Sequence, residues 1–162
     1  MEKMAQYIKS IEIDSLWSNR KHIYWELRPD VNILSGSNGV GKSTLFRCVL
    51  GLLSGYTGQV LVDGTDARSF SVQEAARHIA YIPQSSRSIF NYSVFDIVLM
   101  GRTSGLSTFR SPGKSDKDLS YRAIEKVGIT RLADRCFHRL SGGEQQLVLI
   151  ARALAQQAPV LM

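Results

Sequence analysis

The chain has 162 residues, 44% of them hydrophobic, and a formal net charge of +6. This length allows one domain with a buried core, and no apolar run reaches the roughly 18 residues that a membrane-spanning helix needs. No run of five or six like charges occurs, so the charge does not decide between nucleic acid, an anionic membrane surface, a membrane-embedded partner and a solvated basic surface. The cysteines Cys48 and Cys136 are too few for a disulfide framework.

The first half of the chain alternates strands with helices. Gly55 is expected to close the first helix, and the Asp63-Gly64 pair to form a turn. Ser71 and Glu74 have the spacing of a capping box, which starts a helix. In chain order the predicted elements are a strand at 11–13, a strand at 31–34, a helix over 44–53, a strand at 59–62, a helix over 71–78 and a strand at 79–82.

The second half is rich in helices. Ser141 and Glu144 form another capping box, and Pro159 ends the helix that follows. The predicted elements are a helix over 93–101, a loop over 102–115, and helices over 116–127, 130–135 and 141–157. Strands that alternate with helices predict an α/β architecture with a mostly parallel sheet, into which the stretch 88–150 is inserted as a helical subdomain.

Residues 36–44 fit a loop that binds phosphate. Glycines let the backbone curl and point its N–H groups at phosphate oxygens, and the next helix adds the positive end of its dipole. Lys42 supplies a charge to the β- and γ-phosphates, and the Ser43 hydroxyl completes the shell of a Mg²⁺ ion. The residues expected to bind ATP here are Gly36, Asn38, Gly39, Val40, Gly41, Lys42, Ser43 and Thr44.

A second glycine-containing turn, Leu140-Ser141-Gly142-Gly143-Glu144, lies far downstream. Its two glycines expose backbone N–H groups at a helix start, where an anion is favoured. A plain helix start with a flexible lead-in would also explain this pattern. The phosphate loop upstream favours nucleotide contact, so Ser141, Gly142, Gly143 and Glu144 are predicted to bind ATP.

From about Val31 to Met162 the chain resembles the ATPase subunits of ATP-binding-cassette (ABC) transporters. The two loops and Tyr81-Ile82-Pro83-Gln84 are specific to that superfamily. The segment 92–102 resembles the subgroup that energises bacterial uptake of ferric siderophores, haem and cobalamin. The resemblance implies a P-loop core with a small antiparallel β part, in which 1–87 forms the nucleotide-binding core, 88–150 the helical subdomain and 151–162 the return to the core.

The resemblance also implies roles for single residues. Gln84 would reach the Mg²⁺ ion and the attacking water, linking the nucleotide to the helical subdomain. The family places its metal-binding aspartate and catalytic glutamate just after the position of Met162. We therefore expect the chain to be truncated before that motif and to be unable to hydrolyse ATP at more than a background rate.

The implied partners follow from the same resemblance. Two subunits, most simply two copies of this chain, would bind ATP between the phosphate loop of one and the signature loop of the other, the turn at 140–144. Transmembrane permease subunits would dock on about 85–102, and a periplasmic or surface substrate-binding protein would act indirectly. The location would be peripheral, on the cytoplasmic face of the inner or plasma membrane.

The first 30 residues depart from this pattern. Trp17 is the best candidate to stack on adenine, with Tyr24 behind it, although packing in the core is the simpler prediction for both. The segment 25–36 looks more like ATPases of DNA repair and chromosome maintenance, which is one alternative function. A nonhydrolytic nucleotide-binding module is another. His22, His78 and His138 lack metal-ligand spacing.

Overall fold

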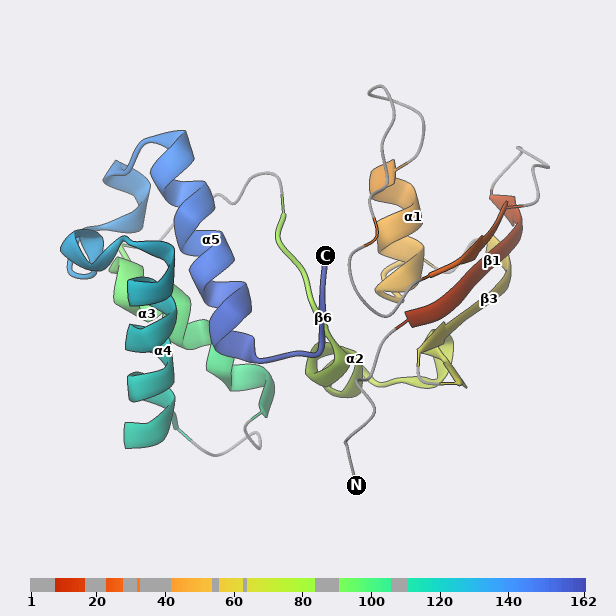
Figure 1. The fold of residues 1–162 in the computed structure, drawn as a ribbon, viewed down its shortest axis with the longest axis horizontal. Coiled ribbons are helices and arrows are strands. Elements are labelled where there is room, and N and C mark those ends of the chain that lie inside the picture. The colour runs from red at the N-terminus through yellow and green to blue at the C-terminus, as the bar shows by residue number, and fades with distance from the viewer. Residues whose placement is uncertain are drawn as a thin grey trace. The chain divides into compact units, whose positions relative to one another are not determined.

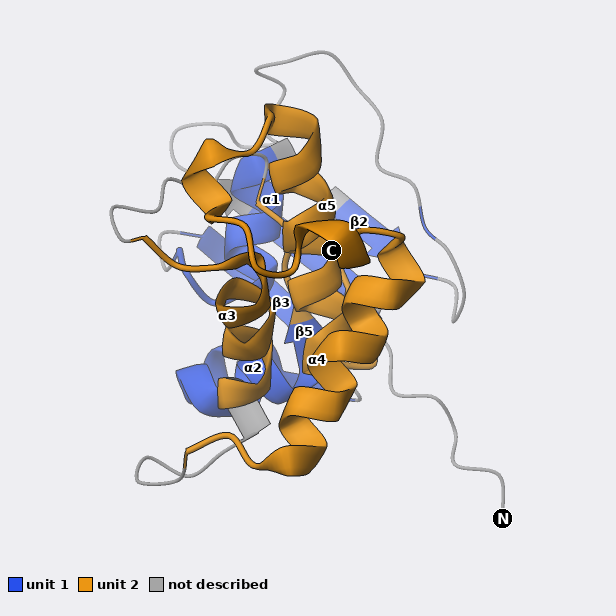
Figure 2. Cartoon of the chain, turned by 90° about the vertical axis from the view of Figure 1, so that its left-hand side faces the viewer, with its two compact units in different colours: residues 1–79 blue, residues 80–162 orange. Residues whose placement is uncertain are grey.

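A computed structural model describes residues 8–16, 23–27, 32, 42–53, 56–62, 64–83, 91–105 and 111–162. The chain divides into two compact units, unit 1 (Met1–Ile79) and unit 2 (Ala80–Met162), coloured blue and orange in Figure 2. The predicted functional regions 1–87, 88–150 and 151–162 stay a prediction. Within the described residues no helix has the length and apolar character needed to cross a membrane.

Unit 1 contains a four-stranded antiparallel sheet with the order β2-β1-β3-β4, in which β1 and β3 form the long central pair (Figure 1). Its strands are β1 (Ile8–Leu16), β2 (Ile23–Glu26), β3 (Tyr56–Val62) and β4 (Thr65–Asp66). Ile11 and Ile13 are buried and Glu12 between them is less so, as their alternation predicts. Gly58 of β3 faces Ile13, and a Cβ at this position would lie 2.3 Å from the Glu12 carbonyl oxygen.

Helix α1 (Lys42–Val49) is shorter than predicted. Gly51 takes a left-handed φ of 68°. Its N–H donates to the Cys48 carbonyl at 3.0 Å, and the next N–H donates to the Arg47 carbonyl at 2.9 Å, which is the bonding of a Schellman helix end. The helix therefore stops before Gly51 rather than before Gly55, which lies outside the described residues.

The capping box predicted at Ser71 is present. Helix α2 (Val72–His78) starts there, with the Glu74 N–H donating to the Ser71 hydroxyl and the Glu74 carboxylate accepting from the Ser71 N–H. A short 3-10 helix, η1 (Ala67–Ser69), precedes it. Both ends of α2 agree with the prediction. The start could be predicted because it is determined by contacts within four residues.

A second sheet joins β5 (Ile79–Ala80) to β6 (Val160–Leu161). The Met162 N–H donates to the Ala80 carbonyl at 2.8 Å, and the Met162 carbonyl accepts from the Ile82 N–H at 2.7 Å. Met162 is therefore hydrogen-bonded to Ala80 and Ile82, the residues on either side of Tyr81. This pattern is typical of parallel strands. The strand predicted at 31–34 lies outside the described residues except Asn32, which is not in a strand.

Three helices of unit 2, α3, α4 and α5, pack against one another in pairs (Figure 1). They enclose a core whose fully buried side chains include Val94, Val98, Ile124, Phe137 and Val148. On one flank the rings of Phe95 and Tyr121 stack, with centroids 4.4 Å apart. The elements are α3 (Val94–Leu99), η2 (Met100–Gly105), α4 (Lys114–Val127), η3 (Thr130–Leu132), η4 (Phe137–Arg139) and α5 (Gly142–Gln156).

Both bounds predicted for the loop over 102–115 are wrong. The 3-10 helix η2 extends α3 as far as Gly105, and α4 begins at Lys114. Asp116 sits in the first turn of α4, where its Oδ2 accepts the Gly113 N–H at 2.9 Å. The helix starts earlier than predicted because Asp116 acts as a capping residue rather than as the first helical residue.

The helix predicted over 130–135 is only the single 3-10 turn η3. Two carbonyls that a longer helix would use are bound by the first turn of α3. The Ala133 carbonyl accepts the Phe95 N–H, and the Arg135 carbonyl accepts the Val94 N–H, both at 2.9 Å. These tertiary hydrogen bonds hold the chain that follows η3 against the start of α3.

Candidate nucleotide-binding site

The first turn of α1 stands at the end of the predicted phosphate loop. Lys42 is the first residue of the helix, Ser43 is exposed and Thr44 is half-buried. That turn holds no acidic residue, so no carboxylate within it offsets the positive end of the helix dipole. The predicted roles of Gly36, Asn38, Gly39, Val40 and Gly41 stay predictions, because these residues lie outside the described part of the chain.

The opposite face of α1 anchors it. Leu45, Cys48 and Val49 are buried at helical spacing, and the helix packs against β3. Burial raises the pKa of the Cys48 thiol, which favours its protonated form. The packing holds the helix by one face and leaves the hydroxyl of Ser43 accessible at the other.

Ser43 fits the predicted Mg²⁺ site. A single hydroxyl at a helix start is the contribution expected when phosphates and water supply the remaining oxygen ligands. No group of three or more His, Cys, Asp or Glu side chains has a metal-binding arrangement within the described residues. Gln84, the second predicted ligand, lies outside them, and its role stays a prediction.

Of the two aromatic residues predicted as candidates for stacking on adenine, only Tyr24 lies within the described residues. Trp17 lies outside the described residues. Tyr24, on β2, is 58% exposed. The prediction that Tyr24 packs in the core is therefore wrong. It sits on a short strand paired only with β1 among the described strands, and its ring points away from the buried residues of the sheet.

The predicted signature loop forms a capped helix start. Leu140 is buried and anchors the approach to α5. Ser141 is the cap: its hydroxyl accepts the Glu144 N–H, while the Glu144 carboxylate accepts the Ser141 N–H at 3.0 Å and its hydroxyl at 2.8 Å. Gln145 reinforces the turn by donating from Nε2 to the Leu140 carbonyl at 3.1 Å. The capping box predicted from the sequence is confirmed.

The glycines of this turn are not required by the fold. Gly142 and Gly143 are exposed, neither has a positive φ, and a Cβ on either would meet no atom within 4 Å. Glycine in a helix costs about 0.5–1 kcal/mol relative to alanine. A helix that begins with two glycines in open space leaves its first N–H groups uncovered, which permits the close approach of an anion.

Two arginines lie near enough to this helix start to affect Glu144. Hydrogen bonds from the backbone and hydroxyl of Ser141 lower the pKa of Glu144, and the nearby Arg131 and Arg135 lower it further. The Glu144 carboxylate accepts hydrogen bonds from Ser141. The positive charges of the two arginines and the positive end of the helix dipole therefore favour the binding of an anion at this turn. Arg131 and Arg135 were not singled out from the sequence, because only the turn around η3 brings them near α5.

A groove of about 300 Å³ opens on unit 2 along α3 and η2. Most of its lining residues lie within the segment 85–102, which is predicted to receive a partner. Its walls are mostly apolar or aromatic, and Asp96 and Thr103 supply polar groups. The lining residues are Tyr92, Asp96, Leu99, Met100, Thr103 and Pro112.

Arg102 ends the predicted docking segment but does not lie on its surface. Its side chain is 17% exposed, and Nε donates to the Asp116 carboxylate at 3.1 Å. Asp116 itself is buried. The sequence did not predict this ion pair, whose two residues lie 14 positions apart along the chain.

The family model described as "ABC transporter" matches residues 21–162. An uncharacterised ABC transporter ATP-binding protein of Haemophilus influenzae is 45% identical over 143 residues, which cover 88% of this chain and 54% of the relative. The manganese transport system ATP-binding protein MntA of Synechocystis is 39% identical, over 82% of this chain and 50% of that protein.

One solved structure, described as an inward-facing ABC transporter of the metal-chelate type, has a TM-score of 0.76 and 33% identity. The match covers 95% of this chain and 57% of that one. The chain thus spans about half the length of the relatives it matches. The agreement confirms the predicted fold class, an α/β P-loop ATPase with an antiparallel β part and a helical subdomain.

Proposed function

Because the chain belongs to the ABC transporter family, we propose that it acts in the ATP-binding subunit of an importer, where ATP binding and hydrolysis drive uptake of a metal chelate such as a ferric siderophore. The observation that carries the proposal is the start of α5, where a capped turn holds two glycines in open space. The relatives named for manganese and for metal chelates support this substrate class. Their names favour transport over DNA repair.

In the proposed site, the phosphate loop and the start of α1 would bind the phosphates of ATP and the Mg²⁺ ion. The N–H groups of 36–41 would surround the phosphates, and Lys42 would place its charge against the β- and γ-phosphates. Ser43 would hold Mg²⁺, which when bound neutralises the phosphate charge. Gln84 would orient the attacking water.

The start of α5 would act on the nucleotide of a second subunit. One phosphate loop and one signature loop occur in the sequence, so a pair of copies supplies two complete sites. The exposed N–H groups of Gly142 and Gly143 would contact the γ-phosphate as charge develops on it. The positive charge of Arg131 and Arg135 supports this role.

The groove on unit 2 would receive the permease. Its apolar and aromatic walls suit a short amphipathic helix, and its residues fall in or beside the docking segment 85–102. Binding there would place the subunit at the cytoplasmic face of the membrane. A substrate-binding protein on the other side would act through the permease.

Hydrolysis would need a carboxylate to activate water, because Gln84 can orient water but is a poor base. Residues 145–162 contain no Asp or Glu. A polypeptide of these 162 residues is therefore expected to bind Mg²⁺-ATP but to hydrolyse it at a background rate.

The phosphate-loop assignment is tested by Lys42→Ala. The lost charge is expected to weaken Mg²⁺-ATP binding about 10- to 100-fold, from roughly 1.5–3 kcal/mol for hydrogen bonds to a charged group. Isothermal titration of the purified chain measures this change. Lys117→Ala, which removes an exposed lysine of α4, serves as the matched control. Unchanged affinity in the Lys42 variant would refute the assignment.

A further inference from the structure

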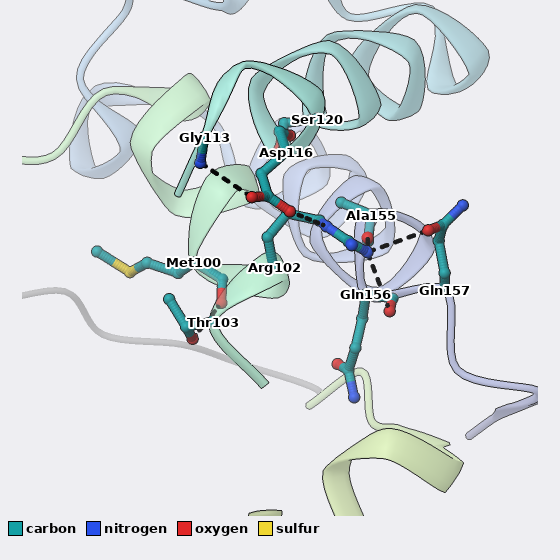
Figure 3. Close-up of polar contacts among 9 residues, drawn as sticks. All are labelled: Met100, Arg102, Thr103, Gly113, Asp116, Ser120, Ala155, Gln156 and Gln157. Carbon is teal, nitrogen blue, oxygen red and sulfur yellow. Dashed lines mark hydrogen bonds and ion pairs between the residues drawn. The ribbon is translucent and has the colours of Figure 1, made fainter. Parts of the chain in front are cut away.

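Arg102 joins two helix ends. From η2, its Nε donates to Asp116 Oδ1 at 3.1 Å (Figure 3). Its Nη1 donates to the Ala155 carbonyl at 2.7 Å, to the Gln156 carbonyl at 3.4 Å and to Gln157 Oε1 at 3.2 Å. One guanidinium thus contacts the first turn of α4 and the last turn of α5. Its planar group with several donors can make both sets of bonds at once.

The charges of this ion pair complement the two helix ends. Asp116 Oδ2 accepts the Gly113 N–H, which places a carboxylate at the positive end of α4. The guanidinium lies at the negative end of α5, where carbonyls lack partners within the helix. The Asp116 carboxylate is therefore bound on both oxygens, and Arg102 satisfies the end of a helix that begins at the signature loop.

The same short segment forms part of the groove wall. Met100 and Thr103 line the groove, and the Thr103 hydroxyl donates to the Met100 carbonyl at 2.7 Å. Between them, Gly101 lies so close to α5 that a Cβ would be 2.3 Å from the Arg152 carbonyl oxygen. One side of η2 therefore lines the groove, and its other side packs against α5 and is hydrogen-bonded to it.

Helix α5 connects that fastening to the signature loop. It has 15 residues, so its two ends are separated by about 22 Å at 1.5 Å per residue. A packed helix of this length moves as a rigid body. A displacement of its last turn is then carried to Ser141, Gly142 and Gly143.

We infer that Arg102 is a positioning residue, which fastens the groove wall to the C-terminal end of α5 so that occupation of the groove sets the position of the signature loop. The inference rests on the proposed function, in which a permease occupies the groove. Arg102 contacts neither nucleotide nor permease in this role and acts through α5.

The fastening is tested by hydrogen exchange of the purified chain. The double variant Arg102→Gln/Asp116→Asn removes both charges together, so that no unpaired charge stays buried. Peptides that cover 100–105 and 152–158 are expected to exchange about tenfold faster, because the hydrogen bonds that suppress local opening are lost. The matched control, Arg122→Gln, changes an exposed arginine of α4 and is expected to have no effect. Unchanged exchange in the double variant overturns the inference.

The positioning role is tested in the complete transporter, reconstituted in vesicles. The double variant is expected to keep its ATP affinity and its assembly with the permease, and to lose most of the transport and of the permease-stimulated hydrolysis. Arg102→Lys is expected to lie between it and the wild type, since one ammonium group cannot reach both helix ends. Normal transport by a variant with accelerated exchange would overturn the positioning role. If the wild type shows no ATP-dependent transport, the proposed function fails, and the exchange experiment alone decides whether Arg102 fastens η2 to α5.

Discussion

Gly101 shows how one residue can determine the contact between two elements. It is buried where η2 crosses α5, and a Cβ would overlap the Arg152 carbonyl oxygen, an atom of the helix backbone that cannot rotate aside. Its φ is not positive, so the requirement for glycine comes from packing and not from backbone conformation. The sequence places this glycine after an apolar helix, where it reads as a helix end.

Gly101→Ala is accordingly expected to destabilise unit 2 by about 1–3 kcal/mol, the usual cost of overpacking a core. The measurement is urea unfolding followed by the circular dichroism of the helices. Gly142→Ala provides the control, because a Cβ there meets nothing within 4 Å and alanine favours the helix. Equal free energies of unfolding for the two variants would contradict the prediction, because they would show that η2 and α5 can move apart at little cost.

At the scale of the element, the start of α5 depends on a single carboxylate. The Glu144 side chain accepts two hydrogen bonds from Ser141, and these bonds exist at full strength only when the carboxylate is ionised. They hold the pKa of Glu144 below its ordinary value in the folded chain. Protonation of this group therefore weakens the cap and the order of the signature loop.

The pH dependence has a definite sign. A carboxylate whose pKa is lowered by folding stabilises the helix start above its ordinary pKa of about 4.3, and this contribution disappears as the pH falls through the lower folded value. We expect the Ser141 amide signal, followed by NMR from pH 6 downwards, to titrate below the ordinary glutamate range. In Glu144→Gln, which can still accept a hydrogen bond, this titration should be absent. A Ser141 midpoint at the ordinary value would argue against the cap.

At the scale of the whole molecule, each unit carries one half of the proposed nucleotide-binding site. Unit 1 holds the helix that follows the phosphate loop, with a core formed by the sheet and α1. Unit 2 holds the predicted signature loop, the groove and a cluster of buried side chains among α3, α4 and α5. If two copies complete each other's sites, defects in the two units should be separable between copies.

Mixing two inactive forms of the complete subunit tests this arrangement. Lys42→Ala removes the phosphate charge, and Gly143→Asp places a negative charge at the start of α5, where there is room for a side chain. In a mixed pair, one site has both defects and the other has none, so hydrolysis is expected to return to about half of the wild-type rate per mixed pair. Each variant alone should stay inactive. Failure of the mixture, with pairing demonstrated, would contradict a site shared between copies.

The sequence by itself determined the features that depend on neighbouring residues. The capping boxes at Ser71 and Ser141 predicted where two helices begin, since donor and acceptor are only three residues apart. The alternation around Ile11 predicted a strand with one buried side. The motifs and the resemblance predicted the family and fold class that the comparisons confirmed.

The tertiary structure decided what depends on distant partners. The end of the segment 130–135 is bonded to the first turn of α3. Arg102 turns inward because the ends of α4 and α5 offer it a carboxylate and free carbonyls. Tyr24 is exposed because β2 is a short outer strand of the antiparallel sheet described in unit 1. No local pattern encodes these outcomes. A polar group or ring takes its final position by satisfying hydrogen bonds and burial with residues far away along the chain.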